Sequence, residues 1–158
     1  MSGYVFRRAG PGDLPLLNRW KTRPHVAAWW DDEPFTDEDL AEPGYRLWLV
    51  ETRGAPFAML QDYVIHDHPD HHLAALPAGA IGIDLFIGAS DLLDQGHGRG
   101  LVRQHVAAAF AAGVPAVGTD PHPANARAIA AFRAAGFVEI GPALDTPWGR
   151  SLPMAVTR

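Results

Sequence analysis

A glycine-rich segment in the second half of the chain could bind an anion. It runs from Asp94 to Gly100 as Asp-Gln-Gly-His-Gly-Arg-Gly, with three glycines at alternate positions between a strand-like segment and a helical one. Consecutive backbone N–H groups could form an anion nest there, at the positive end of the helix, and Arg99 and Arg103 would add charge. The pattern is neither a Walker loop nor a dinucleotide fingerprint. A pyrophosphate would fit it, and a tight turn without a ligand is the alternative.

Two carboxylates stand next to apolar segments on either side of this loop. Asp84 is isolated in an apolar strand just before it, where burial would raise its pKa toward that of a useful base. Asp120 ends another short apolar segment and precedes Pro121. A structural carboxylate and a simple Asp-Pro turn are the alternatives. We predict that Asp84 and Asp120 are catalytic and bind the substrate.

Aromatic and acidic residues of the first half could bind a cation. Trp29, Trp30 and Asp32 lie in a Trp-Trp-Asp-Asp-Glu run, and seven carboxylates occur between Asp31 and Glu42 without a base. An apolar wall with anionic groups suits an aminosugar or another polyamine, although a solvated surface would show the same charges. Since adjacent helical residues point about 100° apart, we expect one of the two tryptophans in the core.

The elements that must position these residues alternate between strand and helix patterns. Strands are predicted at 4–8, 45–52, 55–65, 81–87, 116–119 and 137–140, and helical segments at 14–20, 25–30, 101–112 and 125–135. In the strand at 81–87, Ile81, Ile83, Leu85 and Ile87 share one face and Asp84 lies on the other. The order predicts a mixed α/β fold.

Composition restricts the function further. The chain has 158 residues, 47% of them hydrophobic, no cysteine and a net charge of −5. One domain covering 1–158 is expected, without disulfides, cysteine-based metal sites or a thiol nucleophile. The acidic balance argues against nucleic acid as a partner. Neither a signal peptide nor a membrane-spanning run is visible, so we expect a cytoplasmic protein.

Three motifs in order resemble one enzyme superfamily. Gln95-x-x-Gly98-x-Gly100, the Asn125-Ala-Arg-Ala-Ile segment and the Ala134-Ala-Gly-Phe segment are similar to landmarks of the GNAT N-acetyltransferases. Gly82-Ile-Asp and Thr119-Asp-Pro look like the aminoglycoside 6′-N-acetyltransferases in particular. The resemblance implies a single mixed, mostly antiparallel sheet with splayed central strands flanked by helices. It also implies acetyl-CoA as the donor.

By the same resemblance, acetyl passes to the 6′-amine of an aminoglycoside by direct attack in a ternary complex, in a monomer or weak homodimer. Asp84 and Asp120 match positions that hold the amine. Phe86 and Ile87 would offer main-chain contacts to pantetheine, and His97 would face solvent or the cofactor. The residues expected to bind the cofactor are Phe86, Ile87, Gln95, Gly96, His97, Gly98, Arg99, Gly100 and Asn125.

Several features depart from the aminoglycoside pattern or stand outside it. Phe132 occupies the place of a Tyr that often protonates the leaving thiolate in the family, and segment 73–80 lacks a carboxylate. The four histidines at 66, 68, 71 and 72 are expected to border the acceptor site, and no metal is predicted. The alternatives are an acyltransferase for a hydroxylysine-like siderophore precursor, acetylation of a protein amine or another polyamine, and a non-catalytic acyl-CoA sensor.

Overall fold

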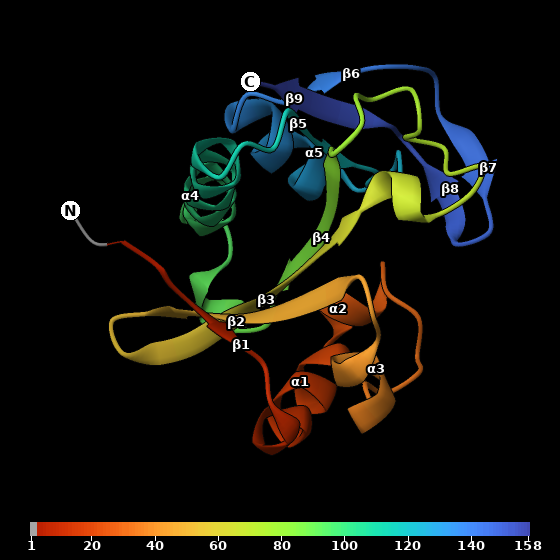
Figure 1. Ribbon diagram of the computed structural model, residues 1–158. Coiled ribbons are helices and arrows are strands. Elements are labelled where there is room, and N and C mark those ends of the chain that lie inside the picture. Colours follow the sequence, from red (N-terminus) through yellow and green to blue (C-terminus); the bar gives the residue numbers. More distant parts are fainter. Residues whose placement is uncertain (1–2) are drawn as a thin grey trace.

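The strands associate into a seven-stranded sheet with the order β1-β2-β3-β4-β5-β9-β6 in the computed structural model, which describes residues 3–158 (Figure 1). Its strands are β1 Val5–Arg8, β2 Tyr45–Thr52, β3 Ala55–Val64, β4 Ile81–Ile87, β5 Ala116–Thr119, β6 Val138–Glu139 and β9 Met154–Thr157. Only β4 and β5 pair in parallel. A separate hairpin joins β7 Leu144–Thr146 to β8 Gly149–Ser151. The predicted mixed, mostly antiparallel sheet is confirmed.

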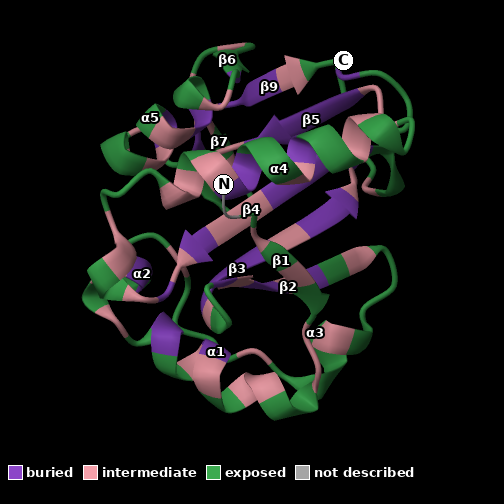
Figure 2. Ribbon diagram, turned by 90° about the vertical axis from the view of Figure 1, so that its left-hand side faces the viewer, coloured by how far each residue is buried: buried purple, intermediate pink, exposed green. Residues whose placement is uncertain are grey.

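Helices flank the sheet in two groups. They are α1 Leu14–Lys21, α2 Pro24–Ala27, α3 Asp37–Ala41, α4 His97–Ala111 and α5 Ala126–Ala134, with 3₁₀ turns at Pro11–Asp13, Ile65–Asp67 and Ser90–Leu92. Figure 1 shows α1, α2 and α3 gathered at one end of the molecule, whereas α4 and α5 lie beside β4 and β5. In Figure 2, α4 crosses in front of β4 and β5 and exposes its outer face.

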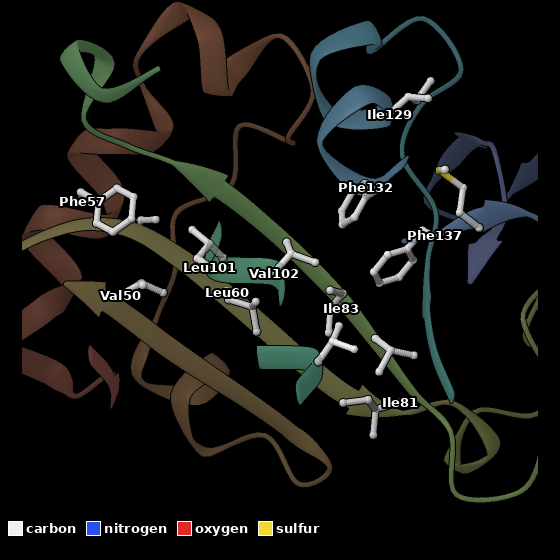
Figure 3. Packing of buried hydrophobic residues seen from close by; sticks show 14 residues of the cluster. Val50, Phe57, Leu60, Ile81, Ile83, Leu101, Val102, Ile129, Phe132 and Phe137 are labelled. Atoms are coloured by element: carbon white, nitrogen blue, oxygen red, sulfur yellow. The ribbon is translucent and has the colours of Figure 1, made fainter. Parts of the chain in front are cut away.

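Alternation along the strands sends successive side chains to these two groups of helices. Ile81 and Ile83 pack with Val102 of α4 and Phe132 of α5, as Figure 3 shows, and Leu85 and Ile87 pack against the same cluster. The predicted apolar face of β4 is therefore confirmed. On the other face, Phe86 packs against residues of the N-terminal helices.

The sheet splays between its two central strands. β4 and β5 pair only over Ile81↔Val117 and Gly82↔Gly118, although β4 continues to Ile87 and stays paired with β3 throughout. At the fork, the Thr119 hydroxyl donates to the Ile83 carbonyl over 3.0 Å. The remainder of β4 therefore has a free edge on the β5 side, as the resemblance implied.

Some elements differ from the prediction. Helix α4 begins at His97, four residues before the predicted start, because Gly96 adopts a left-handed φ of 83° as its N-cap. Because the glycines at 98 and 100 have low helix propensity, the sequence of this first turn indicated a loop. Helix α3 and strands β7, β8 and β9 were not predicted, since all four are too short to show a period.

Candidate functional site

The fork between β4 and β5 opens onto two adjoining cavities. The first, the loop cavity, has a volume of about 590 Å³, and the second, the acidic cavity, about 720 Å³. The residues that line both are Trp29, Trp30, Leu85, Asn125, Ala128 and Phe132. Because the cavities share these walls, a ligand in one would contact a ligand in the other.

The loop cavity contains most of the residues expected to bind a cofactor. Those in its wall are Phe86, Ile87, Gln95, Gly96, His97, Gly98, Arg99 and Asn125. Gly100 is the exception, because a Cβ there would lie 2.7 Å from the Tyr4 hydroxyl oxygen. Its function is close packing in α4. The ring of His97 faces inward as well, and its Nδ1 is 3.0 Å from the same hydroxyl, so it does not point freely into solvent.

Positive charge gathers at the mouth of the loop cavity. The first turn of α4 directs unpaired backbone N–H groups there, and Arg99 and Arg127 line the wall. Arg127 also pairs with Asp94 over 3.1 Å. Arg103 lies one turn further along α4 and donates to the carbonyl of Ala134, a residue of the cavity wall at the end of α5. The arrangement suits a phosphate group.

The free edge of β4 forms another wall of the loop cavity. Its last carbonyls are partly engaged by the chain itself, since His25 Nε2 lies 2.7 Å from the Ile87 oxygen and Arg23 donates to the Gly88 oxygen over 2.7 Å. These two contacts fasten Arg23, the N-cap of α2, and His25, within α2, to the end of β4. They lie 62 and 65 residues apart in sequence, so no local pattern indicated them.

Carboxylates dominate the acidic cavity. Its acidic lining residues are Asp31, Glu33, Asp39, Asp84 and Asp120. Asp32 does not line it: all three residues of the Asp-Asp-Glu run are exposed, but only its first and third reach the cavity. Asp32 forms the bend of a turn in which the Glu33 amide donates to Asp31 Oδ1 over 3.0 Å. A cation would be attracted into this space.

Asp84 and Asp120 meet at the fork of the sheet. Burial raises the pKa of Asp84 well above its usual range, and the charge of Asp120 and a hydrogen bond with it raise it further. Gln61 donates weakly to Asp84 over 3.4 Å and opposes the shift. Asp84 therefore keeps its proton at pH values where a free Asp is ionised. The pair can hold a cation and exchange protons with it.

A histidine lies behind this pair. His72 Nε2 is 2.5 Å from Asp120 Oδ2, and its side chain is 6% exposed. The ring of His71 stacks on it at a centroid distance of 4.2 Å and lines the acidic cavity. Burial lowers the pKa of His71 to about 4, helped by the nearby His72. Their loop was expected to border the acceptor site, but no sequence pattern paired His72 with Asp120.

The two tryptophans line both cavities in different ways. Trp30 packs edge-on against Phe86, with ring centroids 5.2 Å apart and planes at 83°. Trp29 is 43% exposed and faces His122, at a centroid distance of 5.5 Å. Trp30 is thus only partly buried against the core, and Trp29 belongs to the cavity surface. Both follow the end of α2 at Ala27, so the helical segment predicted over 25–30 is shorter than expected.

A buried cation was missed by sequence reasoning. Lys21, whose side chain is 7% exposed, donates to Asp31 over 2.8 Å and to the carbonyl of Glu33 over 2.5 Å. Its ammonium lies 4.7 Å from the ring centroid of Phe35. A lysine in the last turn of a helix is usually solvated, so its type and position gave no signal. It neutralises part of the acidic cavity.

Phe132 extends from α5 to the wall shared by both cavities, so this part of the wall offers no hydroxyl. Within residues 3–158, no group of three or more His, Asp or Glu is placed to hold a metal ion. The helices of the same part of the chain are too short or too polar to cross a membrane.

Comparison with known proteins gives one family. Residues 11–143 match the model of the acetyltransferase (GNAT) domain. Aminoglycoside N(6′)-acetyltransferases type 1 of Klebsiella pneumoniae and Serratia marcescens are each 30% identical over 159 residues, covering 92% of this chain and 79% of the relative.

Solved structures agree with this result. Aminoglycoside acetyltransferase AAC(6′)-Ib in complex with coenzyme A and kanamycin is 30% identical with a TM-score of 0.87, over 99% of this chain and 95% of that one. The same enzyme with ribostamycin and coenzyme A gives a TM-score of 0.88 at 29% identity, over 99% and 94%.

Proposed function

The chain belongs to the acetyltransferase (GNAT) domain family, and we propose that it transfers acetyl from acetyl-CoA to the 6′-amine of an aminoglycoside. One observation carries the proposal: a cavity with a helix start and arginines adjoins a cavity of carboxylates at the splayed strands. A pyrophosphate fits the first and a polycationic amine the second. Relatives with 30% identity are named for this reaction.

The loop cavity has the features that coenzyme A requires. Gly96 allows α4 to begin beside it, and the N–H groups of its first turn with Arg99 and Arg127 would hold the pyrophosphate. At the free edge of β4, the Ile87 amide would pair with the pantetheine arm, since the Ile87 carbonyl is already in contact with His25 Nε2, and Phe86 would line the cavity beside it. When bound, acetyl-CoA supplies an activated thioester carbonyl. The chain aligns this group with the acidic cavity.

Asp84 and Asp120 would bind the reacting amine in the acidic cavity. Burial beside Asp120 raises the pKa of Asp84, so an ammonium group can bind between the two carboxyls without the cost of two adjacent carboxylates. Deprotonation of the ammonium then produces the nucleophile. The tryptophans at 29 and 30 would hold the sugar rings. Direct attack in a ternary complex follows from the shared wall of the cavities.

Water would protonate the departing thiolate. Phe132 lies where the two cavities meet and has no proton to give. A thiolate is a stable leaving group with an ordinary pKa of about 8.5, so it can depart without a general acid. We propose that the enzyme acts as a monomer, because one chain provides both cavities.

The test is an assay of coenzyme A release with purified protein, acetyl-CoA and kanamycin, followed by mass analysis. Rapid release with one acetyl group added to the antibiotic is expected. Hydroxylysine, spermidine and a lysine peptide serve as competing acceptors. A kcat/KM for any of them above that for kanamycin would assign the enzyme to that acceptor class. Binding of acetyl-CoA without turnover of any amine would indicate a sensor.

A further inference from the structure

We infer that Asp94 competes with the cofactor for Arg127: Arg127 holds the Asp94 carboxylate before the cofactor binds and exchanges it for a phosphate group of the cofactor. The inference deepens the proposed function and rests on it for coenzyme A as the ligand. It starts from a conflict within the loop cavity. Arg127 lines this cavity, where it would hold a phosphate, yet its guanidinium already binds a carboxylate.

The ion pair joins two walls of the loop cavity. Asp94 belongs to the segment that leads into α4, Arg127 lies in the first turn of α5, and both residues line the cavity. Arg127 Nε donates to Asp94 Oδ1 over 3.1 Å, and its second nitrogen, Nη2, donates to Oδ2 over 3.4 Å. The carboxylate thus engages the same fork of donors with which an arginine binds a phosphate.

The pair lies on the solvent side of the cavity, where it can be exchanged. The side chain of Arg127 is 52% exposed and that of Asp94 is 69% exposed. Exposed ion pairs add little stability, because water screens the charges and two long side chains lose their freedom. A phosphate would bind the guanidinium and also the free N–H groups at the start of α4, which Asp94 does not engage in the structure. Arg127 therefore gains more from the phosphate than from the carboxylate.

The backbone fixes where the Asp94 carboxylate lies. Asp94 has a left-handed φ of 59°, and Gly96, two residues later, has a φ of 83°. Residues other than glycine seldom adopt this conformation, and Asp and Asn adopt it most readily. The turn before α4 thus carries the side chain to Arg127. An Asn at position 94 would keep the turn and remove the charge.

The exchange weakens cofactor binding in two ways. Arg127 must first release Asp94, and the freed carboxylate then faces a phosphate of like charge at the same cavity mouth. Both effects act equally on acetyl-CoA and on the product coenzyme A, because the two share their phosphates. Asp94 therefore lowers the affinity for the donor and favours release of the product.

The first test measures the Kd of coenzyme A by calorimetry in wild type and in Asp94→Asn, without any acceptor amine. We expect the Kd to fall about two- to tenfold in the variant, as the loss of an exposed ion pair and of one nearby like charge allows. The control is Asp91→Asn, which removes the same charge from an exposed residue of the same segment that does not line the cavity. An equal or higher Kd in Asp94→Asn would overturn the inference.

A double-mutant cycle with Arg127→Gln tests whether Asp94 acts through Arg127. If Arg127 exchanges partners, Asp94→Asn removes both the ion pair and the repulsion in wild type but only the repulsion in Arg127→Gln. We therefore expect a smaller fall in Kd in the Arg127→Gln background. If Arg127 kept Asp94 paired when the cofactor is bound, removal of the arginine would expose the repulsion and the fall would be larger. An equal or larger fall would overturn the exchange.

Ligands with fewer phosphates identify the group that Arg127 takes. If the gain from Asp94→Asn persists with dephospho-coenzyme A, the group is the pyrophosphate, and if the gain is lost there, the group is the 3′-phosphate. With pantetheine, which has no phosphate, we expect no gain, and a gain of the same size would overturn the inference. Failure to acetylate kanamycin would refute the proposed acceptor and leave these results standing. If wild type bound coenzyme A no better than pantetheine, the proposed cofactor site and the inference would both be wrong.

Discussion

Asp84, which we propose to be catalytic, also has a cost to stability. Its pKa in the folded protein lies well above the ordinary value because it is buried beside Asp120. When the pKa of a carboxyl is higher in the folded protein than in the unfolded chain, its contribution to the free energy of unfolding depends on pH. That contribution is fully present below the pKa of the unfolded chain, near 3.9, and is lost as the pH rises through the pKa of the folded protein. The folded protein must then carry a second charge at the fork of the sheet.

Asp84→Asn should therefore separate activity from stability. We expect the variant to lose most of its turnover while retaining coenzyme A affinity, and to melt higher than wild type at pH 8, with the difference decreasing toward pH 4. About 1 kcal/mol of added stability would raise Tm by roughly 2–4 °C in a domain of this size. Thermal unfolding at four pH values checks the prediction. A lower Tm at pH 8, or unchanged turnover, would contradict the assigned role.

We expect Lys21 to lower the affinity of the acidic cavity for cations, because it pairs with Asp31 in the cavity wall. Lys21→Met replaces a buried ammonium by an apolar chain of similar length and frees Asp31 for the substrate. We expect the KM for kanamycin to fall about two- to fivefold at low salt, as a partly exposed ion pair is worth 0.2–1 kcal/mol. Arg19→Met, an exposed site on the same helix, removes the same charge and is the control. A rise in the KM of Lys21→Met would show that the lysine orders the pocket instead.

At the scale of the elements, the end of β4 is fixed by close packing against α1. A Cβ on Gly88 would lie 2.0 Å from Cδ2 of Trp20, which is buried among the N-terminal helices. We expect Gly88→Ala to cost about 1–3 kcal/mol, as overpacked cores do, and to raise the KM for acetyl-CoA because the cofactor edge of β4 shifts. Gly12→Ala, where a Cβ meets nothing within 4 Å, should stay within about 0.5 kcal/mol of wild type in urea unfolding. Equal stability of the two variants would refute this packing.

The elements show what the sequence could and could not predict. Long segments with a clear period, such as 45–52 and 81–87, were placed correctly, including the face on which Asp84 lies. The start of α4 at His97 was missed because glycine is a poor helix former, although here it allows the N-cap and close packing. Helix α3 and the hairpin of β7 and β8 have too few residues for a period to appear.

The candidate site was predictable where a motif is contiguous. The glycine segment and the lone carboxylate of β4 could be identified from neighbouring residues. Contacts that depend on the sheet could not be identified in this way. His72 contacts Asp120, which is 48 residues away in the sequence, and His25 contacts Ile87, which is 62 residues away. Arg103 was expected to add charge to the anion site, and its contact with the carbonyl of Ala134 at the end of α5 could not be predicted. Spacing along the chain indicates position only within a single element.

At the scale of the whole molecule, charge is divided between the cavities. Seven carboxylates fall between Asp31 and Glu42, and three residues of that segment, Asp31, Glu33 and Asp39, line the acidic cavity. Attraction of a polycation by exposed charges weakens with salt, since the Debye length is about 10 Å at 0.1 M and 3 Å at 1 M. We expect the KM for kanamycin to rise about tenfold from 0.05 to 0.5 M NaCl, with kcat little changed. A flat response would contradict the role of this segment.

The most direct test of the account compares neomycin with paromomycin, which differ in having an amine or a hydroxyl at the 6′ carbon. Initial rates of coenzyme A release and product masses are measured for both at equal concentration. We expect rapid transfer of one acetyl group to neomycin and a rate at least 100-fold lower for paromomycin, since the Asp84 and Asp120 pair is arranged for an ammonium. Equal rates of acetylation for the two would show that the chain acts on another amine and would contradict the proposed acceptor.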